Sequence, residues 1–499
     1  MDTFADLALG LRIALAPAML LYCFIGVAVG TLVGVLPGIG AMATISLLLP
    51  VTYQLEPTAA IVMLAGVYYG AQYGGSTASI LLNLPGTPSS AVACLDGYPM
   101  ARAGCAGAAL FTTAVASFVG AMTGVVLLAW FTPSIAALAM RFGPYEYFAM
   151  MLLGLVTAAT LASGSPLKGM AMVVLGLLLG TVGTDVQTGV RRYDFGMPEL
   201  GDGLNLVALA MGLFGVAEVI ASVGRVRPAG DGGRVALRSM WLTRSEWRSA
   251  WPAMLRGSAI GSFFGALPGT GAAIASFMAY AAEKRIARSP QRFGHGAIEG
   301  LAAPEAANNA AAQTAFVPTL ALGIPGDAMM ALMIAALVIH GIQPGPLMLA
   351  EQPAIFWGLV ASFVVGNLML VVLNIPLIGI WVAMLRIPYR MLYPSIVVFV
   401  CLGVYSINRN TFDVVMVAVI GVAGHLLAVL RLQVAPLLLG FVLGPPMEEH
   451  LRRALLLARG DATVFLQRPI SAALLVLTLL VLAWGATSAL RRGHPPRSA

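Results

Sequence analysis

GTLVGVLPGIG, residues 30–40, recurs as GSFFGALPGTG, residues 261–271, and both copies follow the pattern GxxxGxLPGxG. A second pair of motifs follows in the same order, LNLPGT at residues 82–87 and LGIPGD at residues 322–327. Glycine spacing alone is weak evidence, because small residues four apart also serve ordinary helix packing. Two uncommon motifs that recur in the same order predict a two-fold internal repeat.

The composition indicates a protein whose solvent is largely lipid. The chain has 499 residues, of which 59% are hydrophobic and 10% charged, whereas a soluble domain has about 25% charged residues. Apolar stretches long enough to cross a bilayer, each about 20 residues, recur at 13–36, 57–82, 106–131, 147–162, 167–182, 205–222, 354–384, 391–407, 412–430 and 470–490. We therefore predict an all-α polytopic membrane protein of roughly 12 transmembrane helices, some in re-entrant or broken-helix hairpins.

The distribution of charge predicts the domain organisation and the topology. The net charge is +7, but the bases lie in short loops between apolar segments, which is typical of positive-inside topology and not of nucleic-acid binding. Residues 223–250 form a basic linker, which we place in the cytoplasm, between a first membrane repeat (1–222) and a second (251–499). The C-terminal arginines are also assigned to the cytoplasm. The acidic segment 185–202 is a candidate outside loop.

The Pro-Gly motifs allow two interpretations, a kinked spanning helix or a helix that breaks and turns back. Residues 252–282 favour the second, because the apolar arms beside the motif are roughly 15 and 11 residues, short for a span. Basic residues flank both arms, and only a re-entrant hairpin keeps both clusters inside. The stretch 305–341 has a similar shape. Whether the two repeats are inverted or parallel stays open.

Broken helices deep in a membrane persist where they line a polar cavity. Their N-terminal amides attract carboxylates and their unwound carbonyls coordinate cations, so paired interrupted segments point to a transport site. Hydroxyl and carboxamide side chains around the breaks support this, although each could instead bond between helices. The predicted substrate-binding residues are Gly38, Gly40, Ser76, Thr77, Asn83, Pro85, Gly86, Thr87, Gly269, Thr270, Gly271, Asn308, Asn309, Pro325 and Gly326.

Two carboxylates are candidates for ion coupling. Asp327 lies beside the second Pro-Gly and Glu305 lies in an otherwise apolar run. Membrane carboxylates are costly and mark ion or proton sites, so either could carry H⁺ or bind Na⁺, with a possible Na⁺ site near Gly38, Gly269 and Asp327. The alternative is a carboxylate at a water-exposed hairpin end. Glu146, Lys168 and Glu218 lie near segment ends and are interpreted as interfacial.

Catalytic and cofactor motifs are absent from the sequence. The histidines have no metal-ligand spacing, and no GxxxxGK[ST], HExxH or GxSxG element occurs. We therefore expect neither an enzyme nor a cofactor beyond a coupling ion.

At these motifs the chain resembles the large membrane subunit of the tripartite tricarboxylate transporters. The resemblance rests on GVLPGIG (34–40), YYGAQYGGSTASILLNLPG (68–86), LDGYPM (95–100), APEAANNA (303–310) and LGIPG (322–326). These motifs span both halves and are specific as a set.

The resemblance implies a secondary transporter of the bacterial inner membrane, driven as a symport by an ion gradient and taking citrate-like tricarboxylates or other small carboxylates. It also implies two partners, a small membrane subunit of about four helices and a periplasmic solute-binding protein that delivers substrate. No Arg or Lys lies within the polar motifs, so anion binding would depend on backbone amides and neutral donors. A channel or a stand-alone carrier for another small solute is the alternative.

Overall fold

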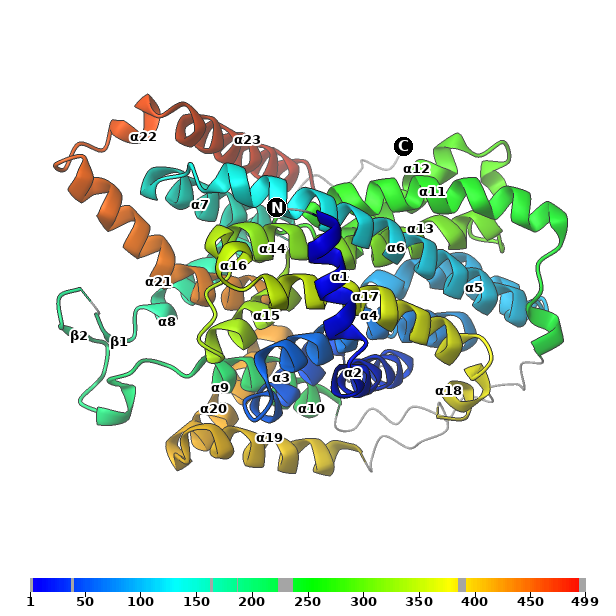
Figure 1. Ribbon diagram of the computed structural model, residues 1–499, viewed down its shortest axis with the longest axis horizontal. Helices are drawn as coiled ribbons and strands as arrows, with labels where there is room; N and C mark the ends of the chain where they lie inside the picture. Colours follow the sequence, from blue (N-terminus) through cyan, green and yellow to red (C-terminus); the bar gives the residue numbers. More distant parts are fainter. Residues whose placement is uncertain are drawn as a thin grey trace.

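A computed structural model describes residues 3–36, 40–161, 165–185, 187–222, 237–384 and 392–492. Nearly all of this is helical, with one two-stranded antiparallel ribbon, β1 (Gly183–Thr184) and β2 (Arg191–Arg192), at the left end of the molecule (Figure 1). Within these ranges five helices are long and apolar enough to cross a bilayer: α2 (Pro17–Val35), α6 (Ala106–Ala139), α17 (Pro353–Asn374), α20 (Thr411–Val429) and α23 (Pro469–Arg492). The all-α, polytopic membrane class is confirmed.

The remaining elements are shorter or less apolar. In the first half they are α1 (Thr3–Ala14), α3 (Ala41–Thr52), α4 (Pro57–Leu82), η1 (Ser89–Val92), α5 (Ala93–Arg102), α7 (Pro144–Leu161), α8 (Pro166–Gly180), η2 (Pro198–Leu200), α9 (Leu206–Ala210), η3 (Met211–Val216) and α10 (Ala217–Ser222). In the second half they are η4 (Leu237–Met240), α11 (Arg244–Ala266), α12 (Gly271–Ile286), η5 (Pro290–Arg292), α13 (Ile298–Thr314), α14 (Phe316–Leu322), α15 (Ala328–Ile339), α16 (Pro346–Glu351), α18 (Ile378–Met384), α19 (Leu392–Asn408), α21 (Val434–Leu457) and α22 (Val464–Gln467).

The glycines that precede each LPG have the same role in both halves. A methyl group on Gly30 would lie 2.5 Å from the carbonyl oxygen of Val67 on α4. A methyl group on Gly265 would lie 2.5 Å from the Cα of Ala311 on α13. Helix α2 therefore packs closely on α4 as α11 packs on α13. Because the two halves use the same contact, their local structure agrees with the duplication seen in the sequence.

The chain breaks at the second LPG and does not merely kink. Helix α11 ends at Ala266 and α12 begins at Gly271, and Gly269 and Gly271 between them have φ of +83° and +66°. Such angles are accessible mainly to glycine and do not occur inside a right-handed helix. Arg256 on α11 forms a bidentate ion pair with Glu283 on α12, at 2.9 and 2.5 Å. The two helices thus fold back on each other as a hairpin, with arms longer than the apolar pattern indicated.

The two halves interlock through the long helix that follows each second motif. Helix α6 of the first half packs on α13 and α11 of the second, and α17 of the second packs on α4 and α2 of the first. Both helices lie across the middle of the molecule (Figure 1). Neither half therefore buries its broken helices without the other.

The structure differs from the prediction in two segments, 354–384 and the linker 223–250. The stretch 354–384 is two helices, since α17 ends at Asn374 just before Pro376, which disfavours helical backbone in the residue preceding it. Of the linker, residues 223–236 lie outside the described residues. Its last part is helical, because Thr243 and Glu246 form a capping box that starts α11 at Arg244. The boundary at residue 250 stays a prediction.

Asp96, within the LDGYPM motif, ties the halves together. Its buried carboxylate accepts hydrogen bonds from the backbone N–H groups of Gly294, Gly296 and Ala297, at 2.8–2.9 Å. The hydroxyl of Tyr280 on α12 donates a fourth, at 3.0 Å. Asp96 was not among the predicted site residues, although its motif supports the family resemblance.

Replacing Asp96 by Ala should therefore destabilise the protein strongly. Three backbone donors would lose a charged acceptor, and each such bond contributes about 1.5–3 kcal/mol. We expect a loss of about 3 kcal/mol or more in the free energy of unfolding, measured by thermal unfolding in detergent. Tyr280→Phe is the control, since it removes one bond and should cost about 1 kcal/mol. Equal melting temperatures for both variants would contradict the role assigned to Asp96.

Candidate functional site

The breaks of both halves meet at one cavity. The cavity has a volume of about 620 Å³ and is lined by Gly40, by Gly86 and Thr87, by the segment 269–274, and by Asp327. These are the ends of all four interrupted segments, two from each half. Helices α10, α20 and α21 complete its wall. The duplication has thus placed both pairs of motifs around one space.

In the second half the two breaks are bonded to each other. The N–H of Gly269 donates to the carbonyl oxygen of Gly326 at 2.6 Å. Next to Gly326, the side chain of Asp327 caps α15 by accepting from the N–H of Met330 at 2.9 Å. Its other carboxylate oxygen accepts from the hydroxyl of Tyr68, on α4, at 3.0 Å. Asp327 is therefore held by both halves at the wall of the cavity.

In the first half, hydroxyl groups gather on a carboxamide. Gln72 accepts through its Oε1 from Ser89 at 2.5 Å and from Thr87 at 3.5 Å. Gly86 lies so close to α2 and α4 that a methyl group would come within 2.7 Å of the Cα of Gly75. This contact holds the break at Gly86 against α2 and α4. Thr87 and Ser89, which follow the break, line the cavity.

Helix N-termini supply the positive end of the site. The first residues of α3, α12 and α21 line the cavity, namely Ala41, Gly271 and Val434 with their neighbours. None of these three helices has a side-chain hydrogen bond at its N-cap. The first amides of a helix lack partners within it and carry partial positive charge, which suits a carboxylate. Among the described lining residues none is Arg, Lys or His.

The predicted residues divide into two groups. Those that line the cavity are Gly40, Gly86, Thr87, Gly269, Thr270, Gly271 and Asp327. Those that lie outside its lining are Ser76, Thr77, Asn83, Pro85, Glu305, Asn308, Asn309, Pro325 and Gly326. Gly38 lies outside the described residues.

Sequence reasoning missed part of the wall. Glu218, interpreted as interfacial, lines the cavity, and so do residues from α20 and α21, including Gly424 and Leu439. A carboxylate in an apolar run was the available signal for Glu218. The wall of α20 and α21 has no such signal, because its residues are ordinary apolar ones that only the packing brings there.

Asn83 has a backbone role. It is exposed and ends α4 with φ of 56°, in the left-handed region. The corresponding residue of the second repeat, Gly323, ends α14 with φ of 71°. Asn and Gly are the residues that adopt this conformation most readily, which explains why these two types occupy equivalent positions.

Accordingly, Asn83→Gly should leave uptake within about twofold of the wild-type rate, because glycine carries no penalty at positive φ. Asn83→Val should cost about 1–2 kcal/mol of stability, because a β-branched residue is strained there. Thermal unfolding and substrate uptake by reconstituted protein measure the two effects. A large loss of uptake in the glycine variant would show that the Asn side chain contacts substrate.

Glu305 lies in a separate buried network on α13. Its Oε2 accepts from Ser117 of α6 at 3.4 Å and from Asn308 at 3.3 Å. Asn309 donates to Ser117 at 2.8 Å. Asn309 thus bonds between helices, which is the alternative interpretation, whereas Asn308 bonds to Glu305 within α13. Oε1 of Glu305 and both polar atoms of nearby Gln313 are buried without a partner among the described residues.

Comparison with known proteins agrees with the features of the site. A sequence model of the tripartite tricarboxylate transporter TctA family matches residues 20–439. The chain is 53% identical over 479 residues to a protein of Agrobacterium vitis described as "Uncharacterized 52.8 kDa protein in TAR-I ttuC' 3'region", covering 96% of this chain and 95% of that one. It is 58% identical over 220 residues to "Uncharacterized protein in TAR-II ttuC' 3'region" of the same organism, covering 44% of this chain and 91% of the other. No solved structure matches.

Proposed function

The chain belongs to the tripartite tricarboxylate transporter TctA family, and from this premise we propose that it imports a tricarboxylate or related small carboxylate, driven by an ion gradient. The family makes it the large subunit of a multi-pass membrane transporter with other subunits. We further propose a bacterial inner-membrane location, with a small membrane subunit and a periplasmic binding protein as partners.

The observation that carries this proposal is the cavity where the breaks converge. Three helix N-termini open onto a space of about 620 Å³, which is large enough for a small organic ligand. A carboxylate bound there would accept hydrogen bonds from backbone amides, and the hydroxyl groups of Thr87, Ser89 and Thr270 line the same space. Such a site binds an anion without burying a guanidinium or ammonium group, and it can release the anion readily.

For the coupling ion we propose Asp327 as the ligand. This residue lines the cavity next to the break at Gly326, and carboxylate and unwound carbonyl oxygens are what Na⁺ binds at such breaks. Glu305 lies in the separate network behind the cavity, so we propose for it a proton-carrying role that requires no contact with substrate. In this proposal Asp327 binds Na⁺ and Glu305 carries H⁺. The dependence of uptake on Na⁺ concentration and on pH distinguishes the two roles.

A channel is the alternative, because broken helices also line ion pores. Both pairs of breaks line one cavity, which favours a carrier, because a carrier binds one substrate at a time between its two halves.

The test is uptake of labelled citrate into proteoliposomes that contain this chain, its small subunit and its binding protein, with and without a Na⁺ or pH gradient. Accumulation that saturates and requires both the gradient and the binding protein supports a coupled tripartite importer. Downhill flux that needs neither would establish a channel. If an intact complex fails to take up citrate, that carboxylate is discarded and other carboxylates are tested against the binding protein.

A further inference from the structure

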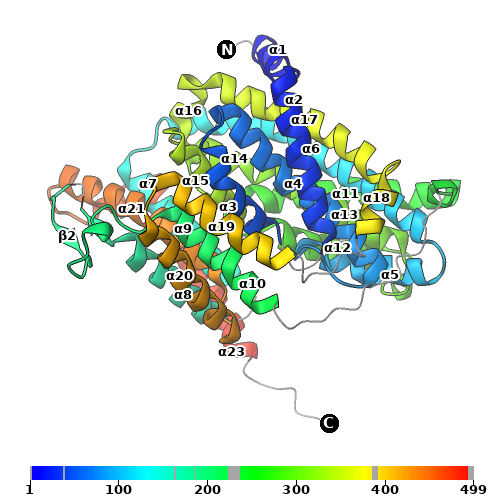
Figure 2. The same ribbon diagram turned by 90° about the horizontal axis from the view of Figure 1, so that it is seen from below.

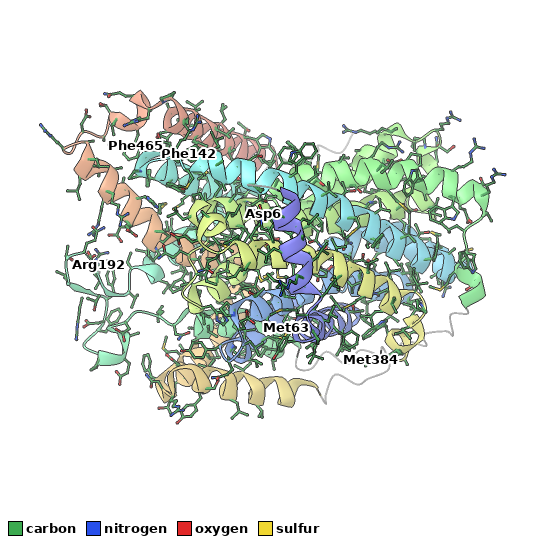
Figure 3. The ribbon with its side chains drawn as sticks, in the orientation of Figure 1. Asp6, Met63, Phe142, Arg192, Met384 and Phe465 are labelled. Carbon is green, nitrogen blue, oxygen red and sulfur yellow. The ribbon has the colours of Figure 1, made fainter. Side chains whose placement is uncertain are left out.

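Residues 187–203, termed the outer loop, project from one end of the molecule and expose apolar side chains. Figures 1 and 2 show the ribbon of β1 and β2 at the same end of the molecule as α21, and Figure 3 places Arg192 at this end, far from Met384. Phe195 is 78% exposed and Tyr193 57% exposed, and Val190 and Met197 beside them are also exposed. Large apolar side chains gathered on a projecting loop mark a contact surface.

The backbone of the outer loop has a fixed shape. At its base the N–H of Thr184 donates to Gly201 at 2.8 Å, and that of Asp185 donates to Val190 at 2.9 Å. Tyr193 and Phe195 have φ of 51° and 50°, which costs an aromatic residue free energy and persists only where the surroundings impose it. A preformed loop loses less entropy on binding a partner than a flexible one.

An ion-pair ring, termed the clasp, joins the base of the outer loop to α21. Arg192 binds both oxygens of Glu448 on α21 at 3.0 and 3.1 Å, and it also pairs with Asp185. Arg452, one turn along α21, pairs with Asp185 at 3.0 Å and with Glu448 at 2.6 Å. Two carboxylates and two guanidinium groups thus alternate. The N–H of Gln187, the Thr188 hydroxyl and both arginines hold the pKa of Asp185 well below its ordinary value, so it stays ionised.

Helix α21 runs from the clasp to the cavity. Its first residues, Val434 to Pro436, and Leu439 line the cavity, whereas Glu448 and Arg452 belong to the clasp. Leu439 and Glu448 are nine residues apart, about 14 Å along a helix. Close packing of α8 on α21 stiffens this connection, since a methyl group on Gly440 would lie 3.1 Å from the N of Leu177.

The distribution of charge assigns the outer loop to the outside. The run α9–η3–α10 leads from the outer loop to the arginine-rich segment that begins at residue 223. Helix α12, on the right side of Figure 1, ends in Lys284 and Arg285, and Arg288 and Arg292 follow in the sequence. By the positive-inside rule that end is cytoplasmic, so the outer loop faces the opposite compartment.

We propose that the outer loop is the docking surface for the soluble protein that delivers substrate, and that the clasp and α21 couple its docking to the cavity. This rests on the proposed function. Exposed Tyr, Phe, Met and Arg are the residues enriched in protein interfaces. On the same loop Asp194, Glu199 and Asp202 outnumber Arg191 and Arg192, so the loop has no basic cluster of the kind that binds anionic lipid, which favours a protein over the membrane as the occupant.

The test of docking is the Kd of the cognate binding protein for the complex in nanodiscs. The variant is Tyr193→Asn with Phe195→Asn, because Asn removes the rings and tolerates positive φ. We expect the Kd to rise at least about tenfold, as for the loss of interface aromatic residues. Ile286→Asn, an exposed apolar residue at the basic end, is the control and should leave the Kd unchanged.

The test of coupling is Arg452→Gln, with Arg453→Gln as its matched control. Arg453 pairs with Glu449 within α21 and makes no ion pair with the outer loop among the described residues. At saturating binding protein we expect uptake to fall at least about fivefold in Arg452→Gln. A change of about fivefold is the lower end of what coupling between two sites typically produces. Arg453→Gln should match the wild type.

Two results would overturn the inference. An unchanged Kd in the aromatic double variant would remove the outer loop as the docking surface and leave the lipid surface as the occupant of its aromatic side chains. Equal uptake in Arg452→Gln and Arg453→Gln would remove the coupling. A wild-type complex that binds no binding protein would instead refute the proposed function itself.

Discussion

Asp327→Asn lowers uptake at least about tenfold and changes its dependence on the coupling ion. The carboxylate accepts from the N–H of Met330 and the hydroxyl of Tyr68, and an amide retains the shape while losing the charge. Hydrogen bonds to charged groups contribute about 1.5–3 kcal/mol, and about 1.4 kcal/mol corresponds to a tenfold change in rate. The measurement is initial uptake as a function of Na⁺ concentration and of pH.

Tyr68→Phe is the matched control for Asp327→Asn. It removes one hydrogen bond to the carboxylate but keeps the charge. Uptake should fall by less than in Asp327→Asn, and the number of ions bound per substrate, read from the steepness of the Na⁺ dependence, should stay the same. If Asp327→Asn leaves the ion dependence identical to that of the wild type, Asp327 has no part in coupling.

Gly269→Ala abolishes most uptake, for two independent reasons. Its φ of +83° strains any residue with a side chain, by about 1–2 kcal/mol. A Cβ would also lie 2.6 Å from the N of Ala158, and such overpacking costs about 1–3 kcal/mol. The break must then shift, which moves the amide that donates to Gly326. A displacement of about 1 Å at a site can cost a hundredfold in rate.

Gly40→Ala separates these two causes. Gly40 lines the same cavity at the equivalent position of GxG as Gly271, and it has a φ of +67°. Among the residues that the structure describes, nothing lies within 4 Å of the Cβ it would gain. The variant therefore has only the strain of about 1–2 kcal/mol, and we expect it to insert and to keep most of its uptake. Equal losses in Gly269→Ala and Gly40→Ala would show that crowding at Ala158 is unimportant.

The membrane class and the repeat could be predicted because they depend on local patterns. Bilayer length selects apolar stretches of a fixed size, and each of the ten predicted stretches is mostly helical where it is described. The motifs LPGxG and LxxPG end helices through proline and through glycine at positive φ, which are properties of the residues themselves. Gly40, Gly86, Gly269 and Gly271, which these motifs singled out, line one cavity, and their binding of substrate stays a prediction.

Assignments from polarity alone were less accurate. Asn83, Asn308 and Asn309 are polar in apolar surroundings, which predicts either a ligand site or bonds between helices. In the structure Asn83 ends helix α4, and the side chains of Asn308 and Asn309 donate hydrogen bonds to Glu305. Polarity shows that a side chain needs a partner, but only the tertiary structure shows whether that partner is protein or substrate.

The sequence by itself determined that this chain is a duplicated, all-helical membrane protein with broken helices in both halves, because residue size, apolar length and backbone preference act over a few residues. Only the tertiary structure decided that all four breaks meet at one cavity, that Asp96 joins the halves, and that α21 connects the cavity to the clasp. These depend on contacts between residues such as Asp96 and Gly296, or Arg192 and Glu448, which are far apart in the chain and are brought together only by packing.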